Sequence, residues 1–424
     1  MNVLIIGFFI FLILLVIGAP IWLALGMSGG FWAFIQMGLP TESISSQFFI
    51  ATNSWILLAV PYFLLAGNLM TYMGPADKMF KFINNLVGHL PGGLPSAAVV
   101  TAAIFGALSG SSVATVIAVG SMAISQMVKL GYSKENSYGV IAASGTLGQM
   151  IPPSIFMILF AASTQLDPGQ LFIAGIVPGI FIAFVLVIVA IIISFRDKTE
   201  RPKRASLSDM ISSFISALPA LIMPVVILGG IYGGVFTPTE AAAIAVFYVL
   251  IISLVFSRKE FTLANFKKSL ISTMVTTSII FILLGGAQLF STAITFLQVP
   301  QFITEFAVNL NVPDWTIMLM IIATFLFFGM FLEAIPIMYI TIPILYPTVL
   351  SLNYDPIHFA VITVASLMIG QITPPIGSSL YALSGHFKEN MGVVVKGSYP
   401  YLIGLIIATL VILYVPWLST FIFE

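Results

Sequence analysis

The chain has 424 residues, of which 59% are hydrophobic and only 7% are charged, and its 15 basic residues balance its 15 acidic ones. A soluble protein needs roughly a quarter of its residues charged to cover its surface, so this composition indicates a polytopic membrane protein. The zero net charge offers no basic surface for nucleic acid, and the absence of cysteine excludes disulfides, thiolate metal sites and cysteine nucleophiles.

Apolar segments of about 20 residues, the length that crosses a bilayer, follow one another along the chain. The first has no basic residues before it, unlike a signal peptide, so we expect it to remain as a membrane helix. We expect ten crossings, at 3–18, 20–37, 51–73, 136–165, 170–195, 211–231, 239–256, 272–297, 355–385 and 398–418.

Two further apolar segments, 92–128 and 315–350, have polar or bent centres. The first contains Ser109 to Ser112 and the second contains Glu333 to Pro336. Each segment is either a re-entrant hairpin or a pair of helices with a kink. Non-helical backbone at membrane depth is tolerated where it is buried in protein or lines a wet cavity. The hairpin interpretation therefore makes both tips candidates for a transport site.

Positive charges predict the orientation. Basic clusters at 196–204 and 258–268 indicate cytoplasmic loops. The loops near Asp167, Asp314 and Asp355 carry acidic residues and no basic ones, so we expect them outside. This orientation makes residues 196–209 a cytoplasmic linker and places both termini outside.

An internal repeat is the strongest signal in the sequence. Residues 130–154 align without gaps with residues 352–376, and eight of the 25 positions are identical. Both copies contain Gly-Gln-x-x-Pro-Pro, starting at Gly148 and Gly370, and hydropathy alone does not produce this motif. Gly106 and Gly329 precede the motif by nearly equal spacings, which makes the two tips equivalent and favours re-entrant hairpins over kinked helix pairs.

The number of crossings predicts how the two copies are related. Five expected crossings precede the linker and five follow it, and an odd number inverts the second copy in the membrane. We therefore predict two inverted repeats, 1–195 and 210–424. Inverted repeats with substrate sites at their interface are characteristic of secondary transporters.

Each Pro-Pro motif is expected to break its helix, one within 136–165 and the other within 355–385. Prolines have no N–H to donate, so carbonyl oxygens one turn earlier should lose their partners and become ligands for a hard cation. A new half-helix should begin at the prolines, and its N-terminus attracts anions. Each break is thus predicted to offer carbonyls to Na⁺ and a helix end to a carboxylate.

The tips add side-chain chemistry. The hydroxyls of the Ser109 to Ser112 tip could ligate Na⁺, whereas the alternative is a small-residue packing surface. Glu333 could complete a cation site or carry a proton, whereas the alternative is a glutamate that holds the shape of its tip. Glu240 follows Thr237 at the spacing of a capping box, so we assign it a structural role.

These arguments define two sets of candidate site residues. The candidate sodium ligands are Ser109, Gly110, Ser112, Gly145, Gln149, Glu333, Gly370 and Thr373. The candidate substrate-binding residues are Ser111, Pro153, Ser154, Pro375, Gly377 and Ser378. The chain lacks a Gly-x-x-x-x-Gly-Lys-[Ser/Thr] loop, which excludes ATP hydrolysis by that device. We expect no cofactor, with Na⁺ as the coupling ion.

Four motifs resemble those of a known family: 106–115, 148–154, 237–243 and 370–377. They are similar to the large membrane subunit of tripartite ATP-independent periplasmic (TRAP) transporters, and the resemblance covers nearly the whole chain in length, motif order and hydropathy. It implies a bacterial inner-membrane protein with an elevator-type mechanism, in which both hairpins and both broken helices slide against a scaffold. It also implies Na⁺ at the hairpin tips and carboxylate substrates such as C4-dicarboxylates and sialic acids.

The resemblance further implies two partners, a small four-helix membrane subunit and a soluble periplasmic protein that captures the substrate. The alternative is a stand-alone sodium symporter of the divalent-anion type. Those related symporters carry Ser-Asn-Thr at each tip, and this chain does not, which argues against that alternative. A membrane-embedded enzyme would need a paired nucleophile and base or a metal cluster, and the sequence suggests neither.

Overall fold

A computed structural model describes residues 2–197, 199, 202–310 and 312–423, and this part of the chain is helical with no β-strand. Among the described helices, seven are long and apolar enough to cross a membrane, or eight when a pair bent by 67° is taken as one span. The prediction of an all-α polytopic membrane protein is therefore confirmed. The predicted linker 196–209 includes residues 198, 200 and 201, which lie outside the described residues.

The elements follow one another without any sheet. Up to the linker they are α1 (Asn2–Val16), α2 (Ile21–Ile35), α3 (Thr41–Thr52), η1 (Ile56–Leu58), α4 (Ala59–Tyr72), α5 (Pro75–Val87), α6 (Gly93–Ser109), α7 (Ser112–Lys129), α8 (Lys134–Ser144), η2 (Gly145–Gln149), α9 (Ile155–Thr164) and α10 (Pro168–Ser194). After it they are α11 (Leu207–Tyr232), α12 (Pro238–Phe256), α13 (Leu263–Phe296), α14 (Val299–Asn309), α15 (Asp314–Gly329), α16 (Ala334–Ser351), α17 (Pro356–Gly370), α18 (Ser378–Phe387), α19 (Met391–Tyr414) and α20 (Trp417–Thr420).

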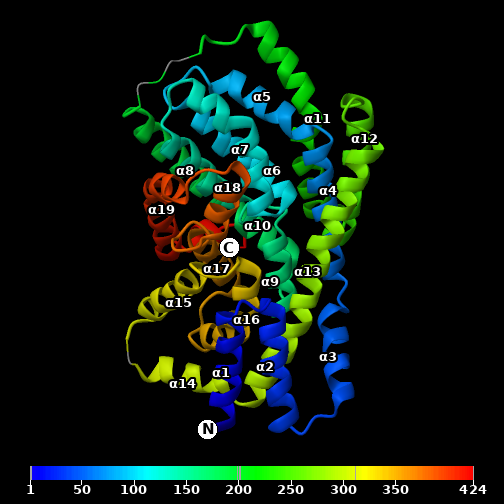
Figure 1. The fold of residues 1–424 in the computed structure, drawn as a ribbon, viewed down its shortest axis with the longest axis vertical. Helices are drawn as coiled ribbons and strands as arrows, with labels where there is room; N and C mark the ends of the chain where they lie inside the picture. Colours follow the sequence, from blue (N-terminus) through cyan, green and yellow to red (C-terminus); the bar gives the residue numbers. More distant parts are fainter. Residues whose placement is uncertain (1, 198, 200–201, 311, 424) are drawn as a thin grey trace.

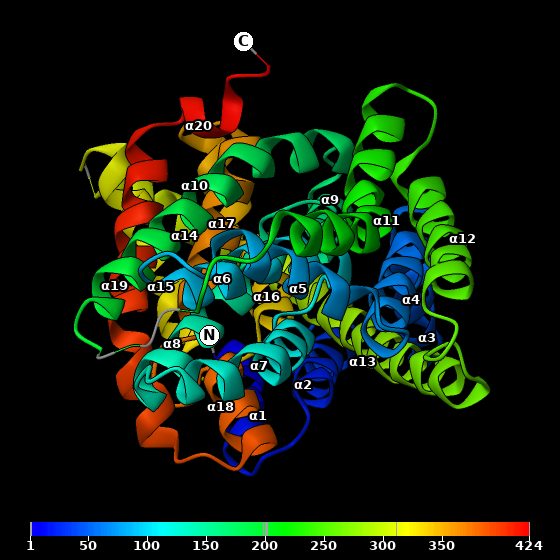
Figure 2. The same cartoon turned by 90° about the horizontal axis from the view of Figure 1, so that it is seen from above.

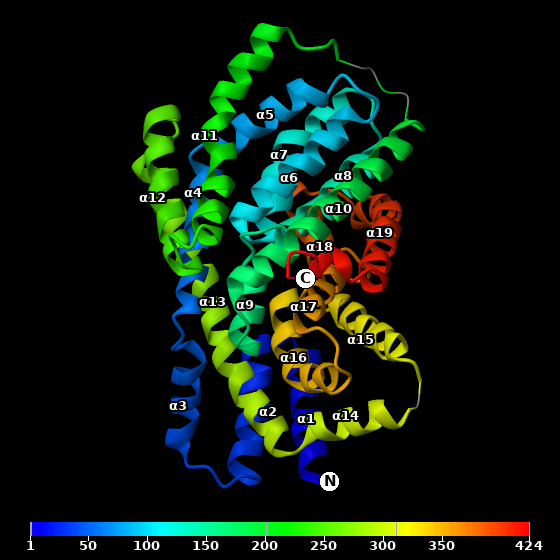
Figure 3. The ribbon, with the colours of Figure 1, turned by 180° about the vertical axis from the view of Figure 1, so that it is seen from behind.

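Helices that adjoin the Pro-Pro motifs and the second tip lie at the centre of the molecule. In Figure 1 and, from behind, in Figure 3, α9, α16 and α17 lie between α13 on one side and α15 and α19 on the other. The view from above in Figure 2 gives the same order, with α4 and α12 beyond α13. The long helix α13 packs against α2, α3, α4 and α16, so it forms a wall beside the centre.

The outer helices are apolar on their outward faces. Phe184 of α10 is 60% exposed, Val225 of α11 is 69% exposed and Phe247 of α12 is 68% exposed. Exposed aliphatic and aromatic side chains on helices of this length fit contact with lipid, which removes the need for a charged surface.

The predicted crossing at 51–73 differs from the structure. Its helix α4 starts only at Ala59, after the short turn η1, and a separate helix α3 precedes it at 67°. Asn53 ends α3 with a φ of −84° and a ψ of 67°, outside the helical region. Thr52, Asn53 and Ser54 interrupt the apolar run at this point, but hydropathy averaged over about 20 residues does not reveal a bend.

Other helix ends also differ. The crossing predicted at 272–297 begins nine residues earlier, at Leu263, because the Thr262 hydroxyl accepts a hydrogen bond from the Asn265 N–H (3.2 Å) and caps the helix. Helices α5 and α14 were not predicted, because both are short and each has one apolar face and one polar face. The predicted capping box is confirmed, because the Thr237 N–H donates to Glu240 (2.8 Å) and the Glu240 N–H to the Thr237 hydroxyl (3.3 Å).

Glycine pairs let the central helices approach closely. A Cβ added to Gly148 would lie 2.4 Å from the Gly106 carbonyl carbon, and one added to Gly329 would lie 2.6 Å from the Gly370 Cα. The first contact joins α6 to η2 and the second joins α15 to the end of α17. Each helix pair is thereby held against the interrupted helix that follows it in the chain.

The start of α8 is tied to α19 and to the loop before it. Lys134 Nζ lies 2.8 Å from Glu389 and Lys396 Nζ lies 3.7 Å from Glu135. The hydrogen bond between the first two side chains raises the pKa of Lys134 and lowers the pKa of Glu389. Exposed ion pairs contribute little to the free energy of unfolding. These contacts therefore orient α8 and add little to the stability of its packing.

Candidate functional site

The first tip, Ser109–Ser112, lies where α6 meets α7. Gly110 has a φ of +58°, a region that favours glycine, and this reverses the chain between the two helices. Ser111 then caps α7, because its hydroxyl accepts a hydrogen bond from the Ala114 N–H (3.3 Å). The Ser109 and Thr115 hydroxyls lie 2.9 Å apart across the turn. The tip is thus rigid and rich in oxygen atoms.

The second tip, Met330–Pro336, lies where α15 meets α16. Its Met330 carbonyl accepts hydrogen bonds from the Ile376 N–H (3.2 Å) and the Gly377 N–H (3.4 Å). These bonds attach the second tip to the chain just beyond the second Pro-Pro pair. Glu333 is the residue before α16, but its side chain does not cap that helix.

Both Pro-Pro motifs interrupt a helix. In the first copy α8 passes into the 3-10 turn η2 and a new helix, α9, begins at Ile155. In the second copy α17 ends at Gly370 and α18 begins at Ser378. Each new helix starts close to the centre of the molecule, where its unpaired N–H groups carry a positive partial charge.

The carbonyl oxygens that were expected to lose their hydrogen-bond partners accept hydrogen bonds from other donors. The Gln149 carbonyl accepts a hydrogen bond from the Ser154 hydroxyl, and the equivalent Gln371 carbonyl accepts one from the Ser379 N–H (3.2 Å). The prediction of unpaired oxygens is wrong at these two positions, because the chain after each Pro-Pro pair turns back and supplies a donor. A carbonyl oxygen has two lone pairs, so each still has room for a cation.

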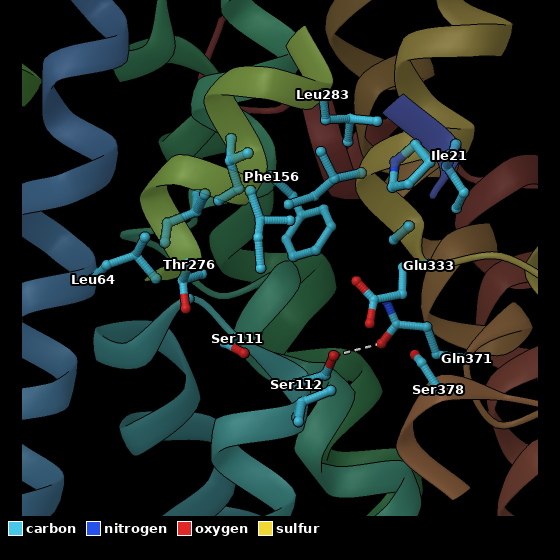
Figure 4. Close-up of a pocket in the computed structure, with 18 of the residues that line it drawn as sticks. Ile21, Leu64, Ser111, Ser112, Phe156, Thr276, Leu283, Glu333, Gln371 and Ser378 are labelled. Carbon is cyan, nitrogen blue, oxygen red and sulfur yellow. Dashed lines mark hydrogen bonds between the residues drawn. The ribbon is translucent and has the colours of Figure 1, made fainter. Parts of the chain in front are cut away.

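A cavity of about 400 Å³ lies between the two tips and the second break (Figure 4). One wall consists of Ser111 and Ser112 from the first tip, Glu333 from the second tip, and Gln371 with Ser378 from the second break. The opposite wall is mainly apolar and comes from α2, α4, α9 and α13. This size and mixture of apolar wall with a few polar groups are typical of small-molecule sites.

Five helix N-termini converge on the cavity. The lining residues Ile21, Ser112, Ile155, Ala334 and Ser378 are the first residues of α2, α7, α9, α16 and α18. Each helix has at least ten residues, so each contributes a dipole whose positive end faces the same space. Helix N-termini bind anions through both the dipole and unpaired N–H groups. The cavity therefore favours a negatively charged ligand.

Glu333 is the one charged side chain among the described residues that line this cavity. It also lines a second cavity of about 510 Å³, together with Tyr381 and His386 of α18. Within the described chain its carboxylate makes no hydrogen bond or ion pair. A carboxylate placed among helix N-termini is stabilised by them, and it is free to bind a cation.

Three buried side chains connect the first break, the first tip and the second break. Gln149 Nε2 donates to Ser112 Oγ at 3.1 Å, and Ser112 Oγ donates to Gln371 Oε1 at 2.5 Å. Their exposed fractions are 0%, 5% and 3%. The two glutamines occupy the same position in the repeated motif, so the repeat brings them to one serine.

The predicted site residues divide into two groups. Those that line the central cavity are Gly110, Ser111, Ser112, Glu333 and Ser378. Those that do not are Ser109, Gly145, Gln149, Pro153, Ser154, Gly370, Thr373, Pro375 and Gly377. Gly145 contacts α7, since an added Cβ would lie 2.1 Å from Val116 Cγ1, and Ser154 caps α9 with its hydroxyl. Their positions fit packing and capping roles next to the cavity.

The lining residues that were missing from the predicted sets include Trp22 of α2, Phe156 of α9, Thr276 of α13 and Gln371. Gln371 belongs to the repeated motif, so its equivalence to Gln149 was the signal for including it. Trp22 lies two residues after Pro20, and a proline is a signal for a helix start. Nothing in the sequence around Thr276 marks it, because its position depends on how α13 packs.

Comparison with known proteins gives one family. The sequence model of "Tripartite ATP-independent periplasmic transporter, DctM component" matches residues 8–418. A C4-dicarboxylate TRAP transporter large permease protein of Pseudomonas aeruginosa is 38% identical, over 93% of this chain and 92% of that protein. A sialic acid TRAP transporter permease protein of Haemophilus influenzae is 31% identical, over 98% of this chain and 68% of that protein. An isethionate TRAP transporter permease protein of Oleidesulfovibrio alaskensis is 36% identical, over 97% and 65%.

A solved structure has the same general fold. The YdaH transporter of Alcanivorax borkumensis superposes with a TM-score of 0.63, over 88% of this chain and 87% of that one, at 15% sequence identity. At this identity the similarity concerns the arrangement of helices alone.

Proposed function

This chain belongs to the DctM component family of tripartite ATP-independent periplasmic (TRAP) transporters, and from that membership we propose that it carries a small carboxylate across a bacterial inner membrane, coupled to Na⁺. The relatives named above are transporter permeases, so we assign this chain transport and no enzymatic reaction. The observation that carries the proposal is the convergence of five helix N-termini on the central cavity.

The charge of the cavity supports an anionic substrate. Its lining contains no lysine or arginine, so the positive potential comes from the helix ends, a device that transporters use for substrate carboxylates. A volume of about 400 Å³ suits a small organic acid. The names of the relatives mention C4-dicarboxylates and sialic acid, and we propose a substrate of this carboxylate class.

Oxygen atoms near the cavity support Na⁺ as the coupling ion. Gln149 Oε1 is buried and has no hydrogen-bond partner within the described residues, and buried acceptors without a partner are unfavourable. The hydroxyls of Ser109 and Ser112 lie in the adjacent tip, and Glu333 supplies a carboxylate at the other tip. We propose one Na⁺ between the first tip and the first break, and a second between Glu333 and the break at Gly370 to Thr373.

The repeated contacts support an inverted-repeat, elevator-type mechanism. Gly106 against Gly148 and Gly329 against Gly370 are equivalent contacts, each between a helix pair and a broken helix. We propose that both pairs are re-entrant hairpins and that they move with the broken helices as one transport domain. The scaffold would include α2, α4 and α13, which form the opposite wall of the cavity.

Two partners complete the proposal. Tripartite systems imply a small membrane subunit and a periplasmic binding protein, and we propose that this chain works with both. One relative is named as a single DctMQ permease protein, and this chain spans only 65% of its length. The remaining part of that relative fits a fused second membrane component.

Reconstitution tests the proposal. Proteoliposomes containing this chain and its two partners are given radiolabelled succinate or N-acetylneuraminate under an inward Na⁺ gradient, and a K⁺ gradient serves as the control. We expect uptake with Na⁺ and little with K⁺, and no substantial uptake by the chain alone. Equal uptake in both gradients would refute sodium coupling. Strong Na⁺-driven uptake by the lone chain would favour the stand-alone symporter instead.

A further inference from the structure

The contacts of Gln149, Ser112 and Gln371 have a direction. A hydroxyl has one hydrogen to donate and two lone pairs that accept. Ser112 uses its hydrogen on Gln371 Oε1 (2.5 Å), so Gln149 must offer its N–H group to the Ser112 oxygen (3.1 Å). Donation therefore runs in one direction, from the first broken helix through the first tip to the second broken helix.

This direction has a consequence at each end. At the start, Gln149 Oε1 points away from Ser112, buried and without a partner among the described residues. At the other end, the Gln371 oxygen faces Ser112 and its N–H₂ group is left for the cavity that Gln371 lines (Figure 4). The second broken helix thus presents a donor to the space that the five helix N-termini surround.

The opposite direction is equally possible for the same three side chains. If both carboxamides turn over, the Gln371 N–H₂ group donates to Ser112 and Ser112 donates to Gln149 Oε1. That arrangement pairs Gln149 Oε1 but takes the acceptor from the Gln149 N–H₂ group, and it turns an acceptor oxygen of Gln371 toward the cavity. An anion in the cavity would then meet an oxygen in place of two N–H donors.

We propose that Gln149, Ser112 and Gln371 form a relay in which a cation on Gln149 Oε1 fixes the Gln371 carboxamide with its N–H₂ group toward the anion in the cavity. The cation supplies the partner that Gln149 Oε1 lacks, so it stabilises the observed direction. Gln149 and Ser112 are then positioning residues, and Gln371 is the group that contacts the substrate. The inference rests on the proposed sodium-coupled function. In this relay a bound cation increases the affinity for the anion, and a bound anion increases the affinity for the cation by the same factor.

Sodium binding to a variant at the opposite end of the relay from Gln149 tests the relay. In Gln371→Met the acceptor is gone, so the Gln149 carboxamide can turn over and accept the Ser112 hydrogen on Oε1, which competes with the cation. Calorimetric titration of the full-length purified chain with NaCl, at constant ionic strength in choline chloride, should show the Kd for Na⁺ rising roughly five- to thirty-fold. In a Ser112→Ala background the same substitution should change the Kd by less than about two-fold, because the relay is already broken.

Controls separate the outcomes. Gln126→Met makes the same change on α7, where Gln126 bonds only to the Met122 carbonyl (2.9 Å), and it should leave the Kd unchanged. Ser112→Cys, whose thiol is a weak donor, provides a second background if Ser112→Ala does not bind Na⁺. An unchanged Kd in Gln371→Met, or the same change in both backgrounds, overturns the relay alone. A wild-type chain that binds no Na⁺ refutes sodium coupling as well.

Discussion

Hydroxyl groups near the proposed cation sites already make hydrogen bonds, yet they remain available as ligands. Ser109 Oγ lies 2.9 Å from Thr115 Oγ1, and Thr373 Oγ1 donates to the Ile369 carbonyl at 2.7 Å. Donating a hydrogen leaves the oxygen lone pairs of a hydroxyl free. Each of these side chains can therefore hold the local turn and contact a cation.

Removing these hydroxyls should weaken Na⁺ binding while the fold persists. For Ser109→Ala and Thr373→Val we expect a loss of about 1–2 kcal/mol per ligand, a roughly five- to thirty-fold rise in the Na⁺ concentration for half-maximal transport. The measurement is uptake against Na⁺ concentration in proteoliposomes. Ser121→Ala removes an α7 hydroxyl that bonds only within its helix and serves as the control. Unchanged Na⁺ dependence in both test variants would rule out these ligands.

Glu333 lines two cavities, and its side chain has no bonding partner in the described part of the chain. Glu333→Gln keeps the size of the side chain and removes its charge, so we expect the melting temperature to stay close to that of the wild type. Loss of a charged ligand should raise the half-saturating Na⁺ concentration more than Ser109→Ala does, because interactions with charged groups are stronger. Thermal unfolding and Na⁺-dependent uptake measure the two effects. A large fall in melting temperature would instead favour a structural role.

At the scale of helices, glycine determines how closely the broken helices approach their neighbours. The contact of Gly329 with Gly370 brings two backbones together without any side chain between them. The same holds for Gly139 of α8, where an added Cβ would lie 2.0 Å from the Gly397 carbonyl oxygen of α19. Close contacts between small residues are a principal means by which helices associate in lipid.

A methyl group at such a contact should force the helices apart. Gly329→Ala places its Cβ 2.6 Å from the Gly370 Cα, and we expect a destabilisation of about 1–3 kcal/mol. Gly229→Ala is a matched control, because it lies in α11 with nothing within 4 Å of the added Cβ. That control should be neutral or slightly stabilising, since alanine favours helix. Thermal unfolding of the purified chain compares them, and equal melting temperatures would contradict close packing at Gly329.

At the scale of the whole molecule, the charges of the loops predict how the protein is oriented across the membrane. The arrangement of the helices alone does not predict this orientation. The chain from α10 to α11 carries the densest positive cluster, whereas the segment from α14 to the first residue of α15 carries Asp314 and no basic residue. Positive loops remain in the cytoplasm. The orientation proposed here therefore has α14 outside and the start of α11 inside.

Cysteine labelling tests this orientation directly, because the native chain has no cysteine. Lys203→Cys and Asn309→Cys place single thiols on opposite sides. We expect a membrane-impermeant maleimide added to intact cells to label the second variant and not the first, and permeabilised cells to label both. The reverse pattern would invert the orientation, and labelling of both in intact cells would place both loops outside.

The sequence identified many of the residues at the candidate site but not their neighbours. The repeat of Gly-Gln-Met-Ile-Pro-Pro and Gly-Gln-Ile-Thr-Pro-Pro identified both helix breaks, because two consecutive prolines remove two backbone donors. Single prolines such as Pro178 and Pro400 remain inside α10 and α19. It did not reveal that the Gln149 carbonyl would find Ser154, nor that Trp22 and Thr276 would close the cavity. Those contacts join positions far apart in the sequence or depend on the local path of the chain after the prolines.

The sequence by itself determined the membrane class, the position of both breaks and the capping of α12, because hydropathy, proline and short-range capping act within a few residues of one another. Only the tertiary structure decided that five helix N-termini share one cavity and that Ser112 joins Gln149 to Gln371. The physical reason is that a helix end carries its partial charge and a side chain its donor in any fold, but whether they meet depends on how distant helices pack.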